Sequence, residues 1–224
     1  VAELKKKFVA EAKKYHVFPL DASVAGRIVA PRPNITAGRT EFVYTRPMVG
    51  LPQGDSPMLL NASYTITADV EIPQGGAEGV LFSAGDVQGG FSFYVQDGKL
   101  RYVYNYVGSE FFLIESVEAV PEGRHLLRFE FEVTGKPDIA HGKGAPGIGQ
   151  LYIDGRLVGQ GDLPLTMPLI LGLGGGFVCG ADTGSPVWDK YKAPFRFTGK
   201  LYGSTVDVSG ELIKDDENTA KMIL

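Results

Sequence analysis

Short stretches in which apolar and polar residues alternate predict that most of this chain is β-structure. In residues 63–72, Tyr64, Ile66 and every second residue after them are apolar, whereas threonines and acids occupy the positions between. Residues 127–133 alternate in the same way. Successive side chains of a strand point to opposite faces, so this period of two indicates antiparallel strands with one buried face.

Two Asp-Gly pairs predict β-hairpins. Asp97-Gly98 lies in the middle of residues 91–105, and Asp154-Gly155 lies in the middle of residues 151–159, with alternating apolar residues on both sides of each pair. A two-residue turn that matches the twist of the strands needs positive φ angles, which Gly and Asp tolerate. These pairs are the strongest local signals of fold class in the chain.

The first residues instead have the period of a helix. Leu4, Phe8, Ala12 and Tyr15 follow one another at spacings of four, four and three, which places them on one face, while lysines and glutamates occupy the remainder. We expect an amphipathic helix over residues 2–15 that packs against a neighbouring body; the alternative is a basic helix lying on a membrane surface.

These patterns divide the chain into four parts. Residues 1–21 are a helix and turn, residues 22–61 a connecting arm with one strand, residues 62–208 a β-sandwich, and residues 209–224 an acidic C-terminal tail. Roughly ten to twelve short strands with almost no helix between them predict an all-β antiparallel β-sandwich or jelly roll with an N-terminal α-helix. Within it, a shift of the apolar phase predicts a bulge near Gly203, and residues 169–179 form a weak or bulged strand.

Composition and charge indicate which classes of partner to expect. The 30 glycines and 14 prolines punctuate the apolar runs, as in an ordinary globular chain. The net charge is −4 and leaves no basic surface, so we expect neither nucleic acid nor an anionic membrane as a partner. No run approaches the roughly 20 apolar residues of a membrane span, which predicts a soluble protein. The single cysteine, Cys179, cannot form an intrachain disulfide, and we expect a buried thiol.

A pair of glutamates is the first candidate for catalysis. Glu130 and Glu132 lie two apart on one predicted strand, so their carboxylates emerge on the same face, as in a sandwich-fold glycosidase. Sandwich-fold glucanases use Glu-x-Asp-x-x-Glu, whereas this chain has Glu-Phe-Glu-Val-Thr-Gly. We therefore favour a solvated strand face.

Two loop motifs resemble known signatures without completing them. Asp182-Thr183-Gly184-Ser185 matches the sequence around an aspartic-protease carboxylate, but such enzymes need two copies and the chain has one. We expect a turn in which Asp182 accepts hydrogen bonds from backbone N–H groups. The glycine run at residues 172–176 matches neither phosphate-loop signature.

Histidines, tyrosines and sequons offer weaker candidates. The three histidines are too far apart for a metal or acid/base motif, so we expect no metal site. A stripe of three tyrosines would stack sugars if exposed, but is more often core. Two glycosylation sequons matter only in a secreted eukaryotic protein. The residues concerned are His16, His125 and His141; Tyr102, Tyr104 and Tyr106; and Asn34 and Asn61.

Two parts of the chain also resemble the sequences of a known protein family. Residues 8–21, a helix that runs into Pro19-Leu20-Asp21, resemble a late segment of bacterial-type arylsulfatases, and the remainder resembles the extension that follows in longer members of that family. The extension is matched by Arg39-Thr-x-Phe42, Ser63-Tyr-Thr-Ile-Thr-Ala68, Gly75-Gly-Ala-Glu-Gly79-Val-Leu81, Asp97-Gly-Lys-Leu100, Tyr104-Asn105, Leu151-Tyr-Ile-Asp-Gly155, Asp182-Thr-Gly184-x-Pro-Val187 and Pro194-Phe-x-Phe-x-Gly199.

The resemblance implies a concanavalin-like or laminin-G-like sandwich, the non-catalytic C-terminal domain of an arylsulfatase-like sulfuric ester hydrolase. Its role would be structural, entrance-shaping or in homo-oligomers, and its partner the sulfatase catalytic domain of the same polypeptide. That family uses a formylglycine made from Cys/Ser-x-Pro-x-Arg beside a calcium ion. Because Cys179 is followed by Gly-Ala-Asp, the resemblance implies no catalytic, cofactor-binding or metal residue here, and a chain inactive alone.

Two other functions remain open beside this one. A free carbohydrate-binding, lectin-like module would use the sandwich and the tyrosine stripe, and a sandwich-fold glycosidase would use Glu130 and Glu132.

Overall fold

The computed structural model describes residues 1–20 and 35–210, which belong to two separate units, Val1–Asn34 and Ile35–Leu224. In the first unit α1 spans Ala2–Lys14, which confirms the predicted helix. Of its apolar residues only Ala12 is buried, whereas Leu4 and Phe8 are exposed. The Phe8 ring meets Phe18 edge-on at 6.2 Å, so this contact covers only part of the apolar face.

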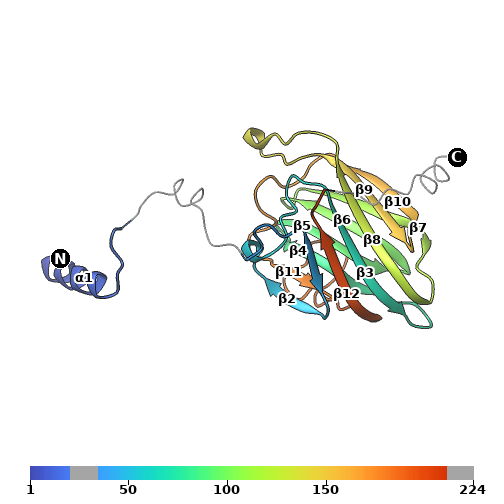
Figure 1. Ribbon diagram of the computed structural model, residues 1–224, viewed down its shortest axis with the longest axis horizontal. Helices are drawn as coiled ribbons and strands as arrows, with labels where there is room; N and C mark the ends of the chain where they lie inside the picture. The colour runs from blue at the N-terminus through green and yellow to red at the C-terminus, as the bar shows by residue number, and fades with distance from the viewer. Residues whose placement is uncertain (21–34, 211–224) are drawn as a thin grey trace. The chain divides into compact units, whose positions relative to one another are not determined.

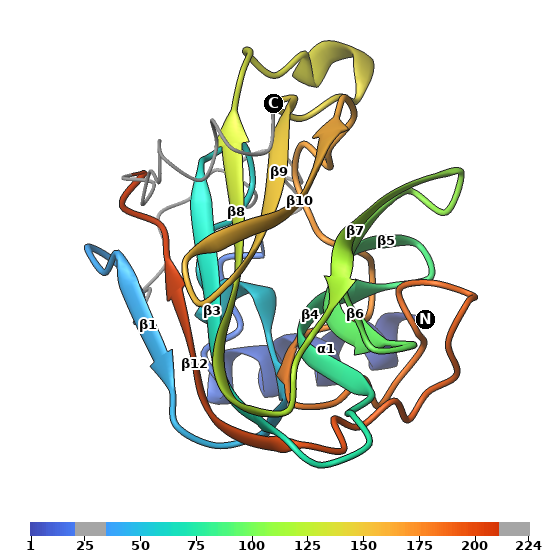
Figure 2. The ribbon, with the colours of Figure 1, turned by 90° about the vertical axis from the view of Figure 1, so that its right-hand side faces the viewer.

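The second unit is a sandwich of two six-stranded antiparallel sheets (Figures 1 and 2). Sheet A has the order β1-β12-β3-β8-β9-β10, and sheet B has the order β2-β11-β4-β5-β6-β7. Its strands are β1 (Glu41–Tyr44), β2 (Met48–Leu51), β3 (Tyr64–Ile72), β4 (Gly79–Asp86), β5 (Gly89–Gln96), β6 (Lys99–Tyr106), β7 (Glu110–Ala119), β8 (Gly123–Val133), β9 (Gly147–Ile153), β10 (Arg156–Leu163), β11 (Phe177–Cys179) and β12 (Lys200–Asp207).

Both Asp-Gly pairs form the predicted hairpin turns. The turn between β5 and β6 has positive φ angles at Asp97 (54°) and Gly98 (71°), and the turn between β9 and β10 has them at Asp154 (50°) and Gly155 (81°). Two consecutive positive φ angles characterise the turn whose twist fits a two-residue hairpin. The Asp-Gly signal therefore placed both turns correctly, although the register of β9 and β10 shifts once more between Leu157 and Gly159.

Aromatic side chains fill the space between the sheets. The ring of Tyr102 from sheet B stacks on Phe129 from sheet A, with centroids 3.5 Å apart, and the Tyr102 hydroxyl lies 2.7 Å from that of Tyr64. Tyr104 is also buried, whereas Tyr106 is half-buried and donates a hydrogen bond to the Gly142 carbonyl. The tyrosine stripe is therefore mostly core, as favoured.

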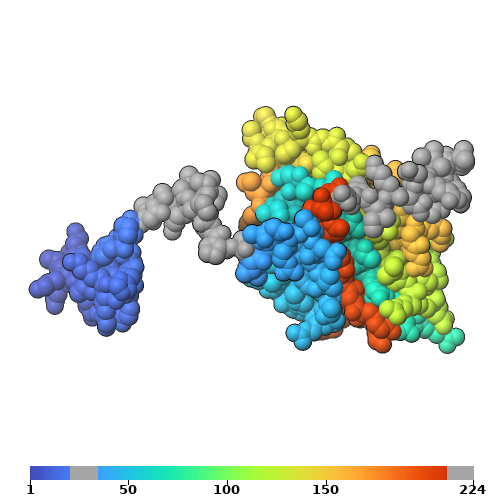
Figure 3. Space-filling model, in the orientation of Figure 1, coloured from blue at the N-terminus to red at the C-terminus, as the bar shows by residue number. Residues whose placement is uncertain are grey.

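The sandwich begins earlier in the chain than predicted. The segment expected to be an arm with one strand is residues 22–61, and its described part, residues 35–61, contains two strands. Each extends a different sheet, since β1 pairs with β12 and β2 pairs with β11. Figure 3 shows β1 in blue beside β12 in red. The pairing partners lie over 120 residues away, so local pattern did not reveal it. Residues 21–34 and the tail from 211 lie outside the described residues.

The edges of the two sheets differ. The long strands β7 and β10 lie side by side, which brings the two sheets together at that margin. At the opposite margin, β1 and β2 are short edge strands of four residues each, joined through Pro47. The register of β12 shifts between Leu201 and Gly203, which confirms the predicted bulge, and of residues 169–179 only β11 is a strand.

Candidate functional site

A loop after β11 covers much of the outer face of sheet B. We call residues 182–195 the flap. Its Tyr191 packs on a small apolar cluster that includes Val80 and Tyr94 of the strands below. The ends of the flap meet, because the backbone N–H of Phe195 donates to the Asp182 carbonyl at 2.9 Å and that of Asp182 donates to the Phe195 carbonyl at 3.4 Å. In Figure 2 it is part of the orange loop beside β4 and β6.

Asp182 fixes the flap from inside. Its carboxylate is 4% exposed and accepts a hydrogen bond of 2.7 Å from the Tyr191 hydroxyl. Burial raises the pKa of Asp182, and hydrogen bonds from Tyr191 and from the backbone N–H groups of Val187 and Gly184 offset part of that rise. Asp182 thus accepts hydrogen bonds from backbone N–H groups, as expected.

Because the pKa of Asp182 is raised, this group should stabilise the fold as the pH falls, whereas acid ordinarily destabilises a protein. The folded chain binds the proton more readily than the unfolded chain, so Asp182 adds stability as the pH falls from neutral through its folded-state pKa. The Asp182→Asn variant lacks this titration. Urea unfolding of both proteins between pH 7 and pH 4 should show the native protein gaining stability relative to the variant; parallel curves would contradict the assignment.

The glycine run wraps around a second buried carboxylate. Asp86, at the end of β4, accepts hydrogen bonds through Oδ2 from the backbone N–H groups of Leu173, Gly174 and Gly175, at 3.2, 2.7 and 3.0 Å. Burial alone would raise the pKa of Asp86, but these bonds and one from Gln88 lower it instead. The run thus forms an anion-binding loop that the chain fills with its own carboxylate.

Asn105 joins the flap to this loop. It is fully buried on β6, and its Nδ2 atom donates to the carbonyl oxygens of Val187 in the flap (2.9 Å), Asp86 (3.2 Å) and Val87 (3.1 Å). Its Oδ1 atom accepts the N–H of Gly108 at 2.7 Å. One side chain therefore holds three segments that are distant in sequence.

Between these supports lies a hollow of about 380 Å³. Val178 and Val49 contribute apolar side chains to it, and Thr183 and Ser185 contribute hydroxyl-bearing ones. Gly175 approaches the strand below so closely that a Cβ atom there would lie 1.7 Å from the Gly85 carbonyl oxygen. The full lining is Val49, Gly50, Gly85, Asp86, Gly174, Gly175, Gly176, Val178, Asp182, Thr183, Gly184 and Ser185.

The hollow has the size of a small-molecule site, since such sites typically measure about 300–1,000 Å³. Among residues 1–20 and 35–210, the charged residues in its lining are Asp86 and Asp182, which the protein's own donors already engage. The structure thus brings together the two loop motifs that were separate in sequence. Sequence reasoning missed Asp86 and Asn105, because their partners lie up to 89 residues away and no local pattern marks them.

The glutamate pair is not a catalytic arrangement. Glu130 is 1% exposed, so the expectation of a solvated strand face is wrong for this residue. Arg128, two residues away on the same face, contacts it at 2.9 Å and lies over the ring of Tyr152 at 4.2 Å, and these neighbours crowd the carboxylate. Burial raises the pKa of Glu130, while Arg128 acts in the opposite direction. The geometry gives the glycosidase hypothesis no support.

The single cysteine is buried, as predicted, and the histidines differ in their surroundings. Cys179 is fully buried 3.4 Å from the Ser204 hydroxyl, and burial raises the pKa of its thiol, as expected for an inert side chain. His125 and His141 each contact a nearby carboxylate, whereas His16 is exposed. Among residues 1–20 and 35–210, no three His, Cys, Asp or Glu side chains are grouped to hold a metal ion.

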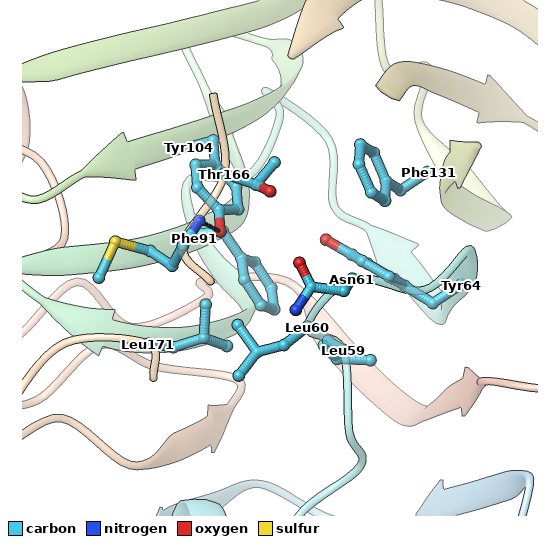
Figure 4. A pocket seen from close by; sticks show the side chains of 10 residues that line it. Leu59, Leu60, Asn61, Tyr64, Phe91, Tyr104, Phe131, Thr166 and Leu171 are labelled. Carbon is cyan, nitrogen blue, oxygen red and sulfur yellow. Dashed lines mark hydrogen bonds between the residues drawn. The ribbon is translucent and has the colours of Figure 1, made fainter. Parts of the chain in front are cut away.

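The Asn61 sequon is engaged in the fold. Its Nδ2 atom donates to the Pro168 carbonyl and its Oδ1 atom accepts the N–H of Ala145, both at 2.9 Å, so the nitrogen that a glycan would modify is already a hydrogen-bond donor within the fold. Asn34 lies outside the described residues. Asn61 borders a second cavity of only about 10 Å³, in which Tyr104 accepts a bond from the Met167 N–H (Figure 4). That space holds at most one water molecule.

Known structures resemble this fold, although no protein-family model and no curated protein matches the chain. The CBM40 domain of the Ruminococcus gnavus IT-sialidase, bound to α2,3-sialyllactose, is similar at a TM-score of 0.52 and 15% identity over 81% of this chain and 94% of that one. The same domain bound to α2,6-sialyllactose gives 0.50 and 15% over 79% and 98%. A third structure of this CBM40 domain is similar at a TM-score of 0.52 and 17% identity over 81% of this chain and 94% of that one.

These likenesses confirm the predicted fold, a concanavalin-like antiparallel β-sandwich. They give no support to the resemblance to arylsulfatases, which stays a prediction. In the part of the chain that the structure describes, no helix is long and apolar enough to cross a membrane.

Proposed function

We propose that this chain is a carbohydrate-binding, lectin-like module that binds a neutral glycan in the hollow beside the flap. The observation that carries the proposal is the hollow itself, which is lined by the apolar side chains of Val49 and Val178, by the hydroxyl groups of Thr183 and Ser185, and by loops that buried carboxylates hold. A pyranose ring has apolar C–H faces and a polar hydroxyl edge, so it matches both kinds of surface. The likeness in fold to a domain described with bound sialyllactose supports the same class of ligand.

The charge of the lining favours a neutral sugar. Acidic sugars are recognised through Arg or Lys, whereas the lining that the described residues form contains Asp86 and Asp182 and no basic side chain. A sugar carboxylate placed here would face like charge without a compensating partner. We therefore expect a specificity that differs from that of the sialyllactose-bound domain.

A comparison of lactose with α2,3-sialyllactose tests this proposal, because the two probes differ by one acidic sugar. Isothermal titration and a panel of immobilised neutral and sialylated oligosaccharides should show neutral sugars bound at least as tightly as their sialylated forms. If only the sialylated probes bind, the hollow is not the site. If no glycan binds the folded chain at millimolar concentration, the module is not lectin-like.

Removing the two rim hydroxyls should weaken binding without unfolding the protein. We expect Thr183→Ala combined with Ser185→Ala to lower affinity about 10- to 50-fold, since each neutral hydrogen bond contributes about 1 kcal/mol. Neither residue is buried, so thermal stability should not change. Thr134→Ala, an exposed threonine after β8, is the matched control. Equal losses in both variants would exclude a specific role for the rim.

A second candidate function is the one the sequence resemblance implies, the non-catalytic C-terminal domain of an arylsulfatase-like enzyme. One observation favours it: Leu4 and Tyr15 on the apolar face of α1 are more than 60% exposed, which suits a helix that packs on a further domain. Under this proposal the isolated chain hydrolyses no aryl sulfate. A Cys/Ser-x-Pro-x-Arg motif in the upstream coding region would support it, and robust turnover by the chain alone would refute it.

A further inference from the structure

Two aromatic rings lie next to each other on the outer face of sheet B. Phe111 of β7 is 40% exposed, and the half-buried Trp188 of the flap lies 6.5 Å from it, with the ring planes 25° apart. Leu113, two residues along β7, is 44% exposed. Together these side chains make a flat apolar surface, which we call the aromatic platform. Such exposed apolar surface on a rigid element commonly marks an interaction site.

The flap holds the tryptophan in place. Trp188 packs on the apolar cluster under the flap, and the next turn is tied to sheet B by a hydrogen bond of 3.3 Å from the Gln96 side chain to the Lys190 carbonyl. Tyr191, three residues after Trp188, is anchored by its bond to Asp182. A rigid aromatic side chain offers large contact area at small entropic cost on binding.

The platform continues from the hollow along the flap. Ser185 lines the hollow and Trp188 follows three residues later. The carbonyl oxygens of Asp86, at the hollow, and Val187, next to Trp188, both accept hydrogen bonds from the same Asn105 nitrogen. Phe111 is the direct cross-strand partner of Asn105. One buried side chain therefore links the hollow with both platform rings.

We infer that the aromatic platform stacks a second sugar residue, so that the site takes a neutral glycan of at least two residues; this inference rests on the proposed function of the hollow. The first residue occupies the hollow, where polar groups and valines surround it. The next residue leaves the hollow toward the platform and places its apolar C–H face on the rings, which replaces water on Trp188 and Phe111.

The test compares single sugars with their oligomers. Isothermal titration measures the affinity of the protein for glucose and galactose and, separately, for cellobiose, cellotetraose and lactose. The oligomer that extends a bound monosaccharide should bind about tenfold more tightly than that monosaccharide, as expected for one aromatic contact. Trp188→Ala should abolish this gain and leave the affinity for the monosaccharide unchanged. Phe111→Ala, on a different element, should reduce the gain, whereas Val117→Ala, exposed on the same strand, is the control.

Fluorescence provides a readout that needs no variant. Trp188 is the single tryptophan of the chain, so its emission reports on the platform alone. Oligosaccharides should shift the emission to shorter wavelength, and monosaccharides should not.

Three outcomes would overturn the inference. If monosaccharides and oligosaccharides bind equally well, or if Trp188→Ala weakens both equally, the proposed function stands and the platform has no role in it. If a protein domain rather than an oligosaccharide shifts the emission, the platform is a protein interface. If no sugar binds, the proposed function fails and this inference fails with it.

Discussion

Replacing Asp86 by asparagine should lower the free energy of unfolding by about 3–5 kcal/mol. The carboxylate is 6% exposed and accepts four backbone hydrogen bonds, and bonds to a charged group contribute about 1.5–3 kcal/mol each without adding fully. The amide group of Asn keeps one acceptor oxygen, which carries no charge, and replaces the other oxygen by an NH₂ donor. Either the glycine run or Gln88 would therefore face a donor, and the remaining bonds would lose their charge.

Urea denaturation measures the loss, and hydrogen exchange at residues 173–175 localises it. Asp189→Asn is the control, because that carboxylate is 74% exposed and contacts only Lys190 among the ion pairs of the described residues. We expect the control to stay within about 0.5 kcal/mol of the native protein. An Asp86→Asn protein within 1 kcal/mol of native stability would show that the loop does not depend on the carboxylate.

The same carboxylate sets an acid limit on the fold. Because the folded-state pKa of Asp86 is lower than its unfolded value, its contribution is fully present above the unfolded pKa of about 3.9 and is lost as the pH falls through the folded pKa. Asp86→Asn should lack this loss below about pH 4. Asp86 and Asp182 thus respond to acid in opposite directions, although both line the hollow.

Asn105→Leu should be about equally destabilising, by about 3–5 kcal/mol, although leucine has almost the same shape. The fully buried amide satisfies three carbonyl oxygens and one N–H group, and leaving such groups unpaired costs about 1–3 kcal/mol each, partly relieved by relaxation. Loss of the bond to Val187 should also release the flap. Faster hydrogen exchange at residues 187–191 and at Gly108 would show this directly.

Gln160→Leu is the control for that substitution, since Gln160 is exposed on β10 of the other sheet. Asn105→Asp separates the two halves of the network: it keeps an acceptor for Gly108 but places negative charge beside three carbonyls, and should destabilise at least as much as leucine. Near-native stability of Asn105→Leu would mean that the other contacts of the flap hold it without the bond from Asn105 to Val187.

Sequence reasoning found the features that neighbouring residues determine. The Asp97-Gly98 hairpin and the alternation of β3 depend on local φ angles and on one buried face, and both were predicted. Features that depend on distant partners were not. Nothing near Asp86 indicates that a glycine run almost 90 residues later will surround it, and nothing near Glu130 indicates that its outer-face position is crowded.

The same distinction between neighbouring and distant residues applies to the candidate site. Asp182 and the glycine run were singled out from the sequence, and both line the hollow. The backbone hydrogen bonds expected for Asp182 are present, whereas the carboxylate that the glycine run surrounds was not predicted. Trp188 drew no attention because a lone aromatic residue in a loop has no pattern. Its partner Phe111 lies 77 positions earlier in the chain, and only the fold brings the rings together.

The short edge strands have a consequence for how this protein behaves at high concentration. An open sheet edge exposes unpaired N–H and C=O groups, and long flat edges therefore promote strand addition between molecules and aggregation. Here the long strands β7 and β10 shield each other, and the open edges are the four-residue β1 and β2, interrupted by Pro47. At high concentration, copies of the protein should therefore resist association through their sheet edges.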